Sequence, residues 1–204
     1  GTILGYVGVM GPQDGVDYLL RALRILVEDL GRREVYCILI GPGDALDELK
    51  ALTADLRLED HVCFTGPIHD PDRLARYLST ADICVDPDPL NSYNDRSTML
   101  KLMDYMAVAR PIVAFDLAEH RRTAEGAAVF VPGNDERGFA EALAALIDDP
   151  ERRERLGRAG RQRVETELAW EYSVVNLLQV YELLLPAARV APVVHPSSEL
   201  AKDA

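Results

Sequence analysis

The chain has 204 residues, 48% of them hydrophobic, and a formal net charge of −12 at pH 7. This composition supplies enough apolar side chains for one large or two small folded domains and excludes global disorder. The acidic balance argues against nucleic acid as the main partner, because phosphate neutralisation needs clustered Lys and Arg. A small phosphorylated ligand needs only a few local donors and stays compatible with the charge.

The sequence opens within an apolar strand-like segment, so we expect a fragment of a longer protein. It shows neither an apolar run of the roughly 20 residues that a membrane span needs nor a signal-peptide pattern. The chain has three cysteines, an odd number, and no two of them are spaced as metal ligands: Cys37, Cys63 and Cys84. We expect all three to be buried free thiols in a reducing cytoplasm rather than disulfides or metal ligands.

In chain order, six apolar segments predict buried strands, over 3–9, 35–40, 61–66, 83–85, 112–115 and 128–131. Between these strands, apolar residues recur at helical spacing over 16–30, 46–56, 74–78 and 100–107, which predicts helices. After the last predicted strand all patterns are helical, over 139–146, 152–168 and 174–184. The alternation predicts an α/β fold, a three-layer Rossmann-like open parallel sheet of about six strands with helices on both faces, plus C-terminal helices. We expect residues 1–185 to form this domain and 186–204 to be a tail, mobile or docked on an absent domain.

In such sheets ligands bind beyond the carboxyl ends of the strands. The first loop there, 8–15, has glycines spaced by three and lacks the G-x-G-x-x-G pattern, which disfavours a dinucleotide fold of the usual kind. Its backbone either approaches a phosphate or forms a plain strand–helix turn, and the glycines alone favour neither. In the second loop, 41–44, Asp44 is a natural helix N-cap, and capping is favoured over ligand contact.

The segment 94–107 carries the stronger signal. Ser97 or Thr98 can cap the helix that follows, and Lys101 and Asp104 share one face of it. Because this helix is mostly apolar, a ligand cleft is favoured over a solvated ion pair, with Lys101 toward a phosphate and Asp104 toward sugar hydroxyls. Glu119 and His120 follow the fifth strand and could face the ligand, although a lone His more often has no such role.

Other polar patterns give no catalytic signature. His61, His69 and His195 are interpreted as surface or strand-edge residues, and neither a Ser-His-Asp pattern, a Cys-His pattern nor a metal cluster emerges. Trp170 and Tyr172 sit at helical spacing with the last helix, and we interpret them as packing residues.

The order of several short motifs resembles a known family. The motifs are GPGD (41–44), VCFTG (62–66), ADI (81–83), KLMDYMA (101–107), RPIVA (110–114) and VPGND (131–135). Together they are similar to the C-terminal domain of group 1 (family four) glycosyltransferases of the GT-B fold, over about residues 1–185. The resemblance implies a nucleotide-sugar donor held in this domain, retention of anomeric configuration, and no cofactor or metal.

The resemblance also implies partners and a location. An N-terminal domain of the same protein would hold the acceptor, in the cytoplasm or at the inner face of the membrane, in polysaccharide or cell-envelope biosynthesis. Neither nucleic acid nor a transmembrane segment of this chain is expected, and peripheral membrane contact of the full protein stays open.

The family has two glutamates eight residues apart. Asp104 matches the second, which holds the ribose hydroxyls, whereas the first falls on Arg96. The family's diphosphate-binding Arg and Lys fall near Val9 or Met10 and on Asp14. We therefore expect Lys101, Ser97, Thr98 and the helix N-terminus to take over part of the phosphate binding. The predicted donor-binding residues are Gly8, Met10, Gly11, Gly43, Asp44, Gly66, Pro67, Ile68, Asp95, Ser97, Thr98, Met99, Lys101, Asp104 and Glu119; no catalytic residue or metal ligand is assigned.

The expected function is that of the donor-binding domain of a retaining glycosyltransferase, inactive without its N-terminal domain. Such an enzyme transfers a sugar from a nucleotide-diphosphate sugar to a glycan, lipid or small-molecule acceptor. One alternative is a nucleotide-sugar-binding or interaction module that has lost catalysis. A weaker alternative is a GT-B sugar-nucleotide epimerase, which would need a fuller set of His and carboxylate residues.

Overall fold

A computed structural model describes residues 1–185, so the predicted tail 186–204 lies outside the described residues. Its centre is a parallel sheet of six strands in the order β3-β2-β1-β4-β5-β6. The strands are β1 (Thr2–Val7), β2 (Val35–Ile40), β3 (Val62–Gly66), β4 (Ile83–Asp86), β5 (Ile112–Phe115) and β6 (Ala128–Val131). The predicted Rossmann-like sheet is confirmed.

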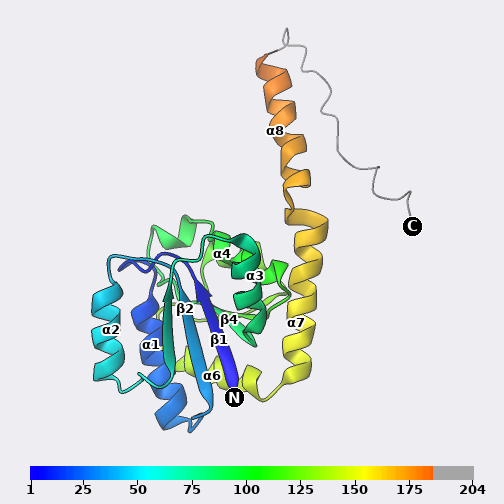
Figure 1. Ribbon diagram of the computed structural model, residues 1–204. Helices are drawn as coiled ribbons and strands as arrows, with labels where there is room; N and C mark the ends of the chain where they lie inside the picture. The colour runs from blue at the N-terminus through cyan, green and yellow to red at the C-terminus, as the bar shows by residue number, and fades with distance from the viewer. Residues whose placement is uncertain (186–204) are drawn as a thin grey trace, which may run out of the picture. The chain divides into compact units, whose positions relative to one another are not determined.

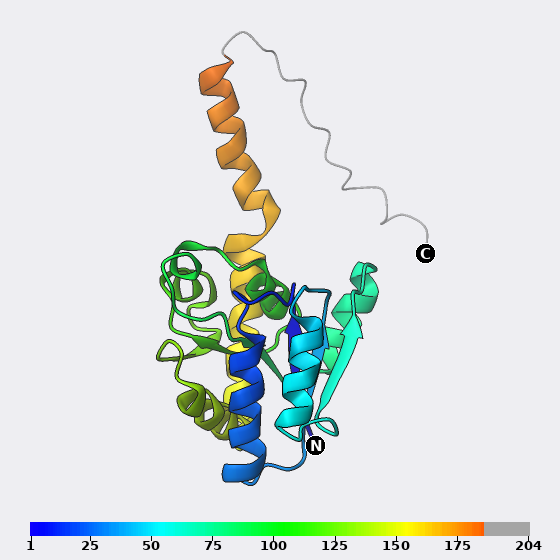
Figure 2. The same ribbon diagram turned by 90° about the vertical axis from the view of Figure 1, so that its left-hand side faces the viewer.

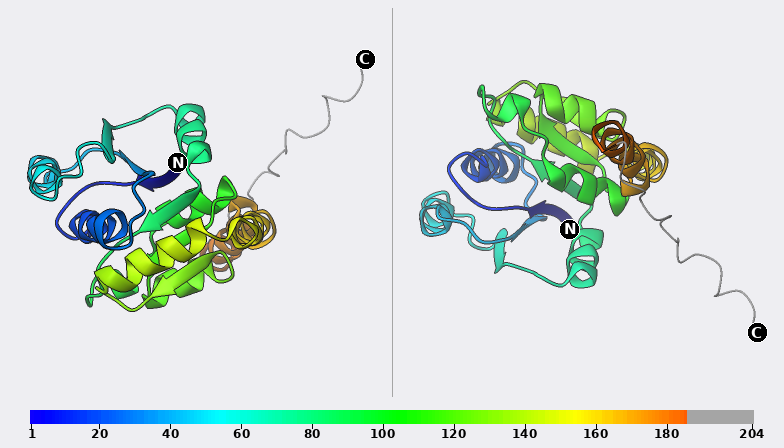
Figure 3. Two further views of the ribbon diagram at one scale, coloured as in Figure 1. Left: turned by 90° about the horizontal axis from the view of Figure 1, so that it is seen from below. Right: turned by 90° about the horizontal axis from the view of Figure 1, so that it is seen from above.

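Helices cover both faces of this sheet, as the end-on views show (Figure 3). On one face lie α1 (Val16–Arg24), which continues into a π-helical turn (Ile25–Asp29), α2 (Leu46–Asp55) and α6 (Glu136–Ile147); α1 contacts both of the others. Figure 2 shows α1 and α2 side by side in front of the sheet. On the other face lie α3 (Pro71–Thr80), α4 (Leu100–Ala107), α5 (Ala118–Ala124) and α7 (Pro150–Arg163).

The core sits between the central strands and these helices. Leu4 and Tyr6 of β1 are fully buried, as are the apolar residues of α1 that face them, Leu19, Leu20 and Leu23. Full burial on both faces of the central strands explains their nearly continuous apolar sequence.

The expected burial of the three thiols is correct for Cys37 and Cys84 and wrong for Cys63, which is exposed. The reason is position in the sheet: β3, which carries Cys63, is an edge strand, whereas β2 and β4 each have strands on both sides.

The contacts divide the chain into two compact units, Gly1–Glu167 and Leu168–Ala204. The described part of the second unit contains α8 (Trp170–Leu184). Trp170 and Tyr172 are 66% and 47% exposed, so the packing role predicted for them is wrong within the described residues. Among residues 1–185, no helix is both long and apolar enough to cross a membrane.

The strand order creates a switch point between β1 and β4. From β1 the chain moves outward to β2 and β3, then returns across the sheet to β4, β5 and β6 (Figure 1). The loops after β1 and β4 therefore leave the carboxyl edge of the sheet in opposite directions and leave a crevice between them, which is where doubly wound sheets bind ligands.

Candidate functional site

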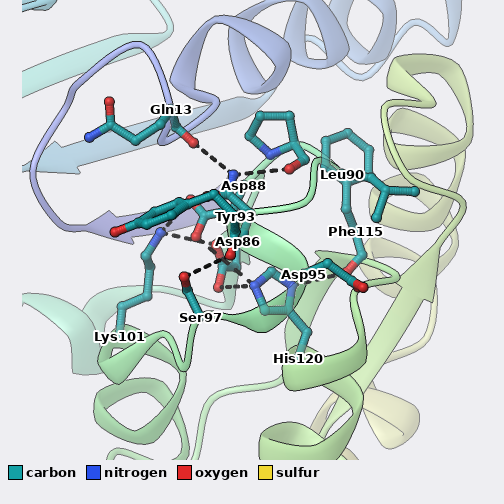
Figure 4. Close-up of polar contacts among 12 residues, drawn as sticks. Gln13, Asp86, Asp88, Leu90, Tyr93, Asp95, Ser97, Lys101, Phe115 and His120 are labelled. Carbon is teal, nitrogen blue, oxygen red and sulfur yellow. Dashed lines mark hydrogen bonds and ion pairs between the residues drawn. The ribbon is translucent and has the colours of Figure 1, made fainter.

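A buried ion cluster lies at the carboxyl end of β4. Asp86 ends that strand, Asp88 follows it, and Lys101 extends from the first turn of α4 (Figure 4). The Lys101 Nζ lies 3.1 Å from Asp86 Oδ1 and 2.7 Å from Asp88 Oδ1. Both carboxylates are fully buried and the Lys101 side chain is 10% exposed. The predicted sharing of one cleft by Lys101 and Asp104 is therefore wrong, because Lys101 turns inward to two aspartates.

His120 completes this cluster from the start of α5. Its ring is fully buried, and Nδ1 lies 3.0 Å from the carbonyl oxygen of Phe115. Because a carbonyl oxygen only accepts, Nδ1 carries the hydrogen and Nε2 faces the carboxylates. Nε2 lies 3.4 Å from Asp86 Oδ2 and 4.0 Å from Asp88 Oδ2. His120 is thus not the isolated residue that the sequence favoured.

The charges in the cluster depend on one another. Burial raises the pKa of Asp88, and the neighbouring Asp86 raises it further. Burial also acts to raise the pKa of Asp86, but the charge of Lys101, together with the neighbouring His120, outweighs it and holds that pKa below its usual value. Burial opposes the charged form of Lys101, yet Asp86 and the other acidic neighbours keep its pKa above the usual value. Lys101 therefore carries its charge inside the protein.

Asp86 and Asp88 were absent from the predicted site. The available signal was an Asp-x-Asp sequence directly after a short apolar strand, which places two carboxylates at a carboxyl edge. His120 then joins them because β5 lies next to β4, so the loop after β5 reaches the same edge.

Side chains of the predicted site connect three loops at this edge. Asn94 Nδ2 donates hydrogen bonds to the carbonyl oxygens of Gln13, at 3.0 Å, and Pro89, at 2.9 Å, joining the loops after β1 and β4. Asp95 Oδ1 accepts from the backbone N–H of Ala118 at 2.8 Å, in the first turn of α5. The loops after β1, β4 and β5 are thus tied together by the segment that the sequence marked.

The capping roles predicted for Ser97 and Thr98 are wrong. Met99 is the N-cap residue of α4, and it makes no side-chain capping bond. Ser97 Oγ instead donates to the carbonyl oxygen of Tyr93 at 2.8 Å, and Thr98 Oγ1 donates to Glu119 Oε2 at 3.0 Å. The preceding 3₁₀ turn of residues 94–96 uses the Ser97 hydroxyl locally, which leaves the N-terminus of α4 without a side-chain cap.

The predicted cap of α2 is wrong as well. Ala45 is the N-cap residue of α2 and makes no side-chain capping bond, so Asp44 lies one residue too early. Asp44 and Ala45 form a turn before α2 begins, and the Ala45 N–H in that turn donates to the carbonyl oxygen of Met10 at 3.1 Å. Asp44 is exposed.

The two glycine-containing loops pack backbone to backbone. The Gly8 N–H donates to the Ile40 carbonyl oxygen at 3.0 Å, and the Met10 N–H donates to the Pro42 carbonyl oxygen at 2.8 Å. A Cβ atom at Gly43 would lie 2.2 Å from the Met10 carbonyl oxygen. The amides of Gly8 and Met10 are therefore engaged within the protein, and Gly43 is needed for loop packing.

Asp14 and Gly11 form a turn at the position where the family pattern has a cation. The Gly11 N–H donates to Asp14 Oδ2 at 2.9 Å. A carboxylate that accepts a backbone N–H closes the loop after β1 locally and adds a negative charge beside Asp88.

Asp104 and the loop after β3 lie apart from the ion cluster. The carbonyl oxygen of Gly66 accepts the Gly41 N–H at 3.1 Å, Pro67 is exposed and Ile68 is half-buried. Asp104 lines a cavity of about 160 Å³ between α3 and α4, with Pro71 and Leu74 among the other lining residues. Burial raises the pKa of Asp104.

Comparison with known proteins gives a consistent family. The model of the family described as glycosyl transferases group 1 matches residues 1–149. A D-inositol 3-phosphate glycosyltransferase of Thermomonospora curvata is 34% identical over 188 residues, covering 88% of this chain and 42% of that protein. A phosphatidyl-myo-inositol mannosyltransferase of Mycobacterium leprae is 30% identical over 173 residues, covering 84% and 43%. The chain thus spans less than half the length of these relatives.

Solved structures agree on the fold. Sucrose-phosphate synthase of Thermosynechococcus elongatus superposes with a TM-score of 0.77 at 27% identity, covering 92% of this chain and 46% of that one. The C-terminal domain of LpcC, a group 1 glycosyl transferase of Francisella tularensis, superposes with a TM-score of 0.69 at 18% identity, covering 82% and 86%. Because the family model matches well over half of its residues, the chain belongs to the group 1 glycosyltransferases.

Proposed function

We propose that this chain is the donor-binding half of a retaining glycosyltransferase that uses a nucleotide-diphosphate sugar. The observation that carries the proposal is the joining of the loops after β1, β4 and β5 at the β1/β4 switch point, through Asn94 and Asp95. Ligands of doubly wound sheets bind at that point. Nine of the predicted donor-binding residues lie in these loops or in the start of α4 and α5: Gly8, Met10, Gly11, Asp95, Ser97, Thr98, Met99, Lys101 and Glu119.

Proteins with a similar fold support the ligand class. HepE of Anabaena was solved in complex with UDP-glucose and resembles this chain with a TM-score of 0.69 at 19% identity. TarM of Staphylococcus aureus was solved in complex with UDP and has a TM-score of 0.78 at 18% identity. The acceptor site is assigned to an N-terminal domain of the full protein, since this chain covers less than half of its curated relatives.

The proposed chemistry is electrostatic. Negative charge develops on the departing diphosphate, and backbone N–H groups at a helix N-terminus stabilise it. The N-terminus of α4 carries no side-chain cap and lies in the joined loops, so its N–H groups are assigned to the diphosphate. Lys101 supports this site from inside, by fixing Asp86 and Asp88, rather than by direct contact with phosphate. Asp104 is assigned to the ribose hydroxyls.

Calorimetric titration of this chain with UDP, GDP, ADP and CMP tests the donor-binding role. We expect saturable binding of one nucleoside diphosphate. No binding by any of these nucleotides at millimolar concentration would overturn the proposal. Transfer of sugar is expected from the full-length protein with its donor and an acceptor, and not from this chain alone.

A nucleotide-sugar-binding module without catalysis is the second candidate. It is favoured by the charges at three positions: Lys101 is engaged by buried aspartates, Arg96 stands where the family pattern has a glutamate, and Asp14 stands where it has a cation. A full-length protein that binds donor but neither transfers nor hydrolyses the sugar would support this candidate. Turnover of donor by the full-length protein would exclude it.

A further inference from the structure

Three buried polar atoms converge on one point beside β4. They are Asp86 Oδ2, Asp88 Oδ2 and His120 Nε2, from three side chains that each offer a metal-ligand atom within 4.8 Å of those of the other two. The three side chains are fully buried, and none of these atoms has a hydrogen-bond partner in the described part of the chain. Figure 4 shows them pointing toward one another from β4, the loop after it and α5. A buried polar group without a partner costs free energy, so the arrangement needs an explanation.

The surroundings of the three atoms fix their orientation. Lys101 contacts the Oδ1 atoms of Asp86 and Asp88, which turns both Oδ2 atoms toward His120. The Phe115 carbonyl oxygen holds the His120 Nδ1–H, which leaves Nε2 as an acceptor in the neutral ring. Metal-bound histidines usually donate their second ring N–H to a carbonyl or carboxylate in this way.

The spacing suits an ion better than direct hydrogen bonds. The Nε2 atom lies 3.4 Å from Asp86 Oδ2 and 4.0 Å from Asp88 Oδ2, beyond the normal hydrogen-bond range. A first-row metal ion binds nitrogen and oxygen ligands at about 2.0–2.2 Å, so two ligands of one ion lie about 3–4 Å apart. The two distances from His120 Nε2 match that geometry.

We propose that Asp86, Asp88 and His120 bind a divalent first-row transition metal ion, of which Zn²⁺ and Mn²⁺ are the tested examples. One imidazole nitrogen with two carboxylate oxygens favours such ions over Mg²⁺ and Ca²⁺, which prefer oxygen ligands alone. The ion joins the end of β4 to the start of α5 and fixes the loop that carries Asn94 and Asp95. Its role is structural, and the site does not depend on the donor-binding function proposed above.

The test uses the full chain without an affinity tag, stripped with a chelator and titrated with Zn²⁺, Mn²⁺ and Mg²⁺ by calorimetry. We expect one equivalent of Zn²⁺ or Mn²⁺ to bind more tightly than Mg²⁺ and to raise the melting temperature. His120→Gln should weaken binding tenfold or more. His61→Gln is the matched control. His61 Nδ1 also lies close to a backbone carbonyl oxygen, that of Val35 at 2.8 Å, but among residues 1–185 His61 belongs to no such group of ligands.

A second measurement needs no variant. In the unaltered protein, substoichiometric Mn²⁺ should broaden the NMR signals of the His120 ring and leave those of His61 sharp. Three outcomes would overturn the proposal: no saturable binding of Zn²⁺ or Mn²⁺ at millimolar concentration, equal affinity in folded His120→Gln and wild type, or broadening at His61 in place of His120. Circular dichroism of the metal-free variants establishes that they are folded.

Discussion

Lys101 Nζ lies 3.1 Å from Asp86 Oδ1, and the two side chains form an ion pair inside the protein. Removing one partner of a buried pair leaves the other charge uncompensated, which typically costs about 3–5 kcal/mol. We therefore expect Lys101→Met, which keeps most of the apolar stem, to lower the free energy of unfolding by about that amount. Urea unfolding followed by circular dichroism measures it.

The control for this prediction is Lys50→Met on α2, where the side chain is exposed. An exposed substitution should change the free energy of unfolding by less than about 0.5 kcal/mol. Equal stability of the Lys101 and Lys50 variants would show that the buried pair contributes nothing.

Gly43 provides a second prediction, on the packing of the first two loops. Its missing side chain allows the Met10 carbonyl oxygen to lie where a Cβ atom would be only 2.2 Å away. Backbone on both sides of the contact must shift to accept alanine, so Gly43→Ala should destabilise the protein by about 1–3 kcal/mol or more.

Gly126→Ala separates this clash from backbone strain. Gly126 has a φ of 78°, and nothing lies within 4 Å of its hypothetical Cβ atom, so alanine there meets conformational strain alone. Thermal unfolding of both variants should show the larger fall in melting temperature for Gly43→Ala. A smaller fall in melting temperature for Gly43→Ala than for Gly126→Ala would contradict the tight packing of the loops.

The sheet was predictable because each strand has its own apolar signature. Strands β2, β4 and β5 are short, mostly apolar segments that are each followed by Gly, Pro or Asp, and their pattern does not depend on what they pair with. The exposure of Cys63 was not predictable in the same way, because edge position is a property of strand order rather than of local sequence.

The candidate site was predictable only in part. Loops at carboxyl edges are rich in polar residues, so the segment around Asn94 and Asp95 stood out. The partners of Lys101 were not predictable in this way. Local spacing within α4 points to Asp104, three residues on, whereas the actual partners, Asp86 and Asp88, lie at the carboxyl end of β4. The sequence interpretation of His120 as a lone histidine was wrong for the same reason, because its cluster forms across β4 and β5.

The proposed contact of Asp104 with ribose predicts a loss of nucleotide affinity in Asp104→Ala. Hydrogen bonds to a charged group contribute about 1.5–3 kcal/mol, so affinity for the best nucleoside diphosphate should fall by about tenfold or more. Affinity for inorganic pyrophosphate should not change, since it lacks the ribose. Asp55→Ala, an exposed aspartate at the end of α2, is the matched control. Equal nucleotide affinity in the two variants would contradict the ribose role.

The pH dependence of nucleotide binding gives a separate test of Asp104. Burial raises the pKa of this carboxyl group, so it takes up a proton at a less acidic pH than an ordinary aspartate, whose pKa is about 3.9. The ionised form accepts hydrogen bonds from ribose hydroxyls and the protonated form accepts them more weakly. Affinity should therefore fall as the pH is lowered toward the raised pKa.

Calorimetry across this range, with wild type and Asp104→Asn, measures the effect. Asparagine cannot ionise, so the variant should start with lower affinity and lose less of it on acidification. Titration of the nucleotide phosphate acts on both proteins equally and cancels in their ratio. If that ratio stays constant with pH, the ionised carboxylate of Asp104 takes no part in binding the nucleotide.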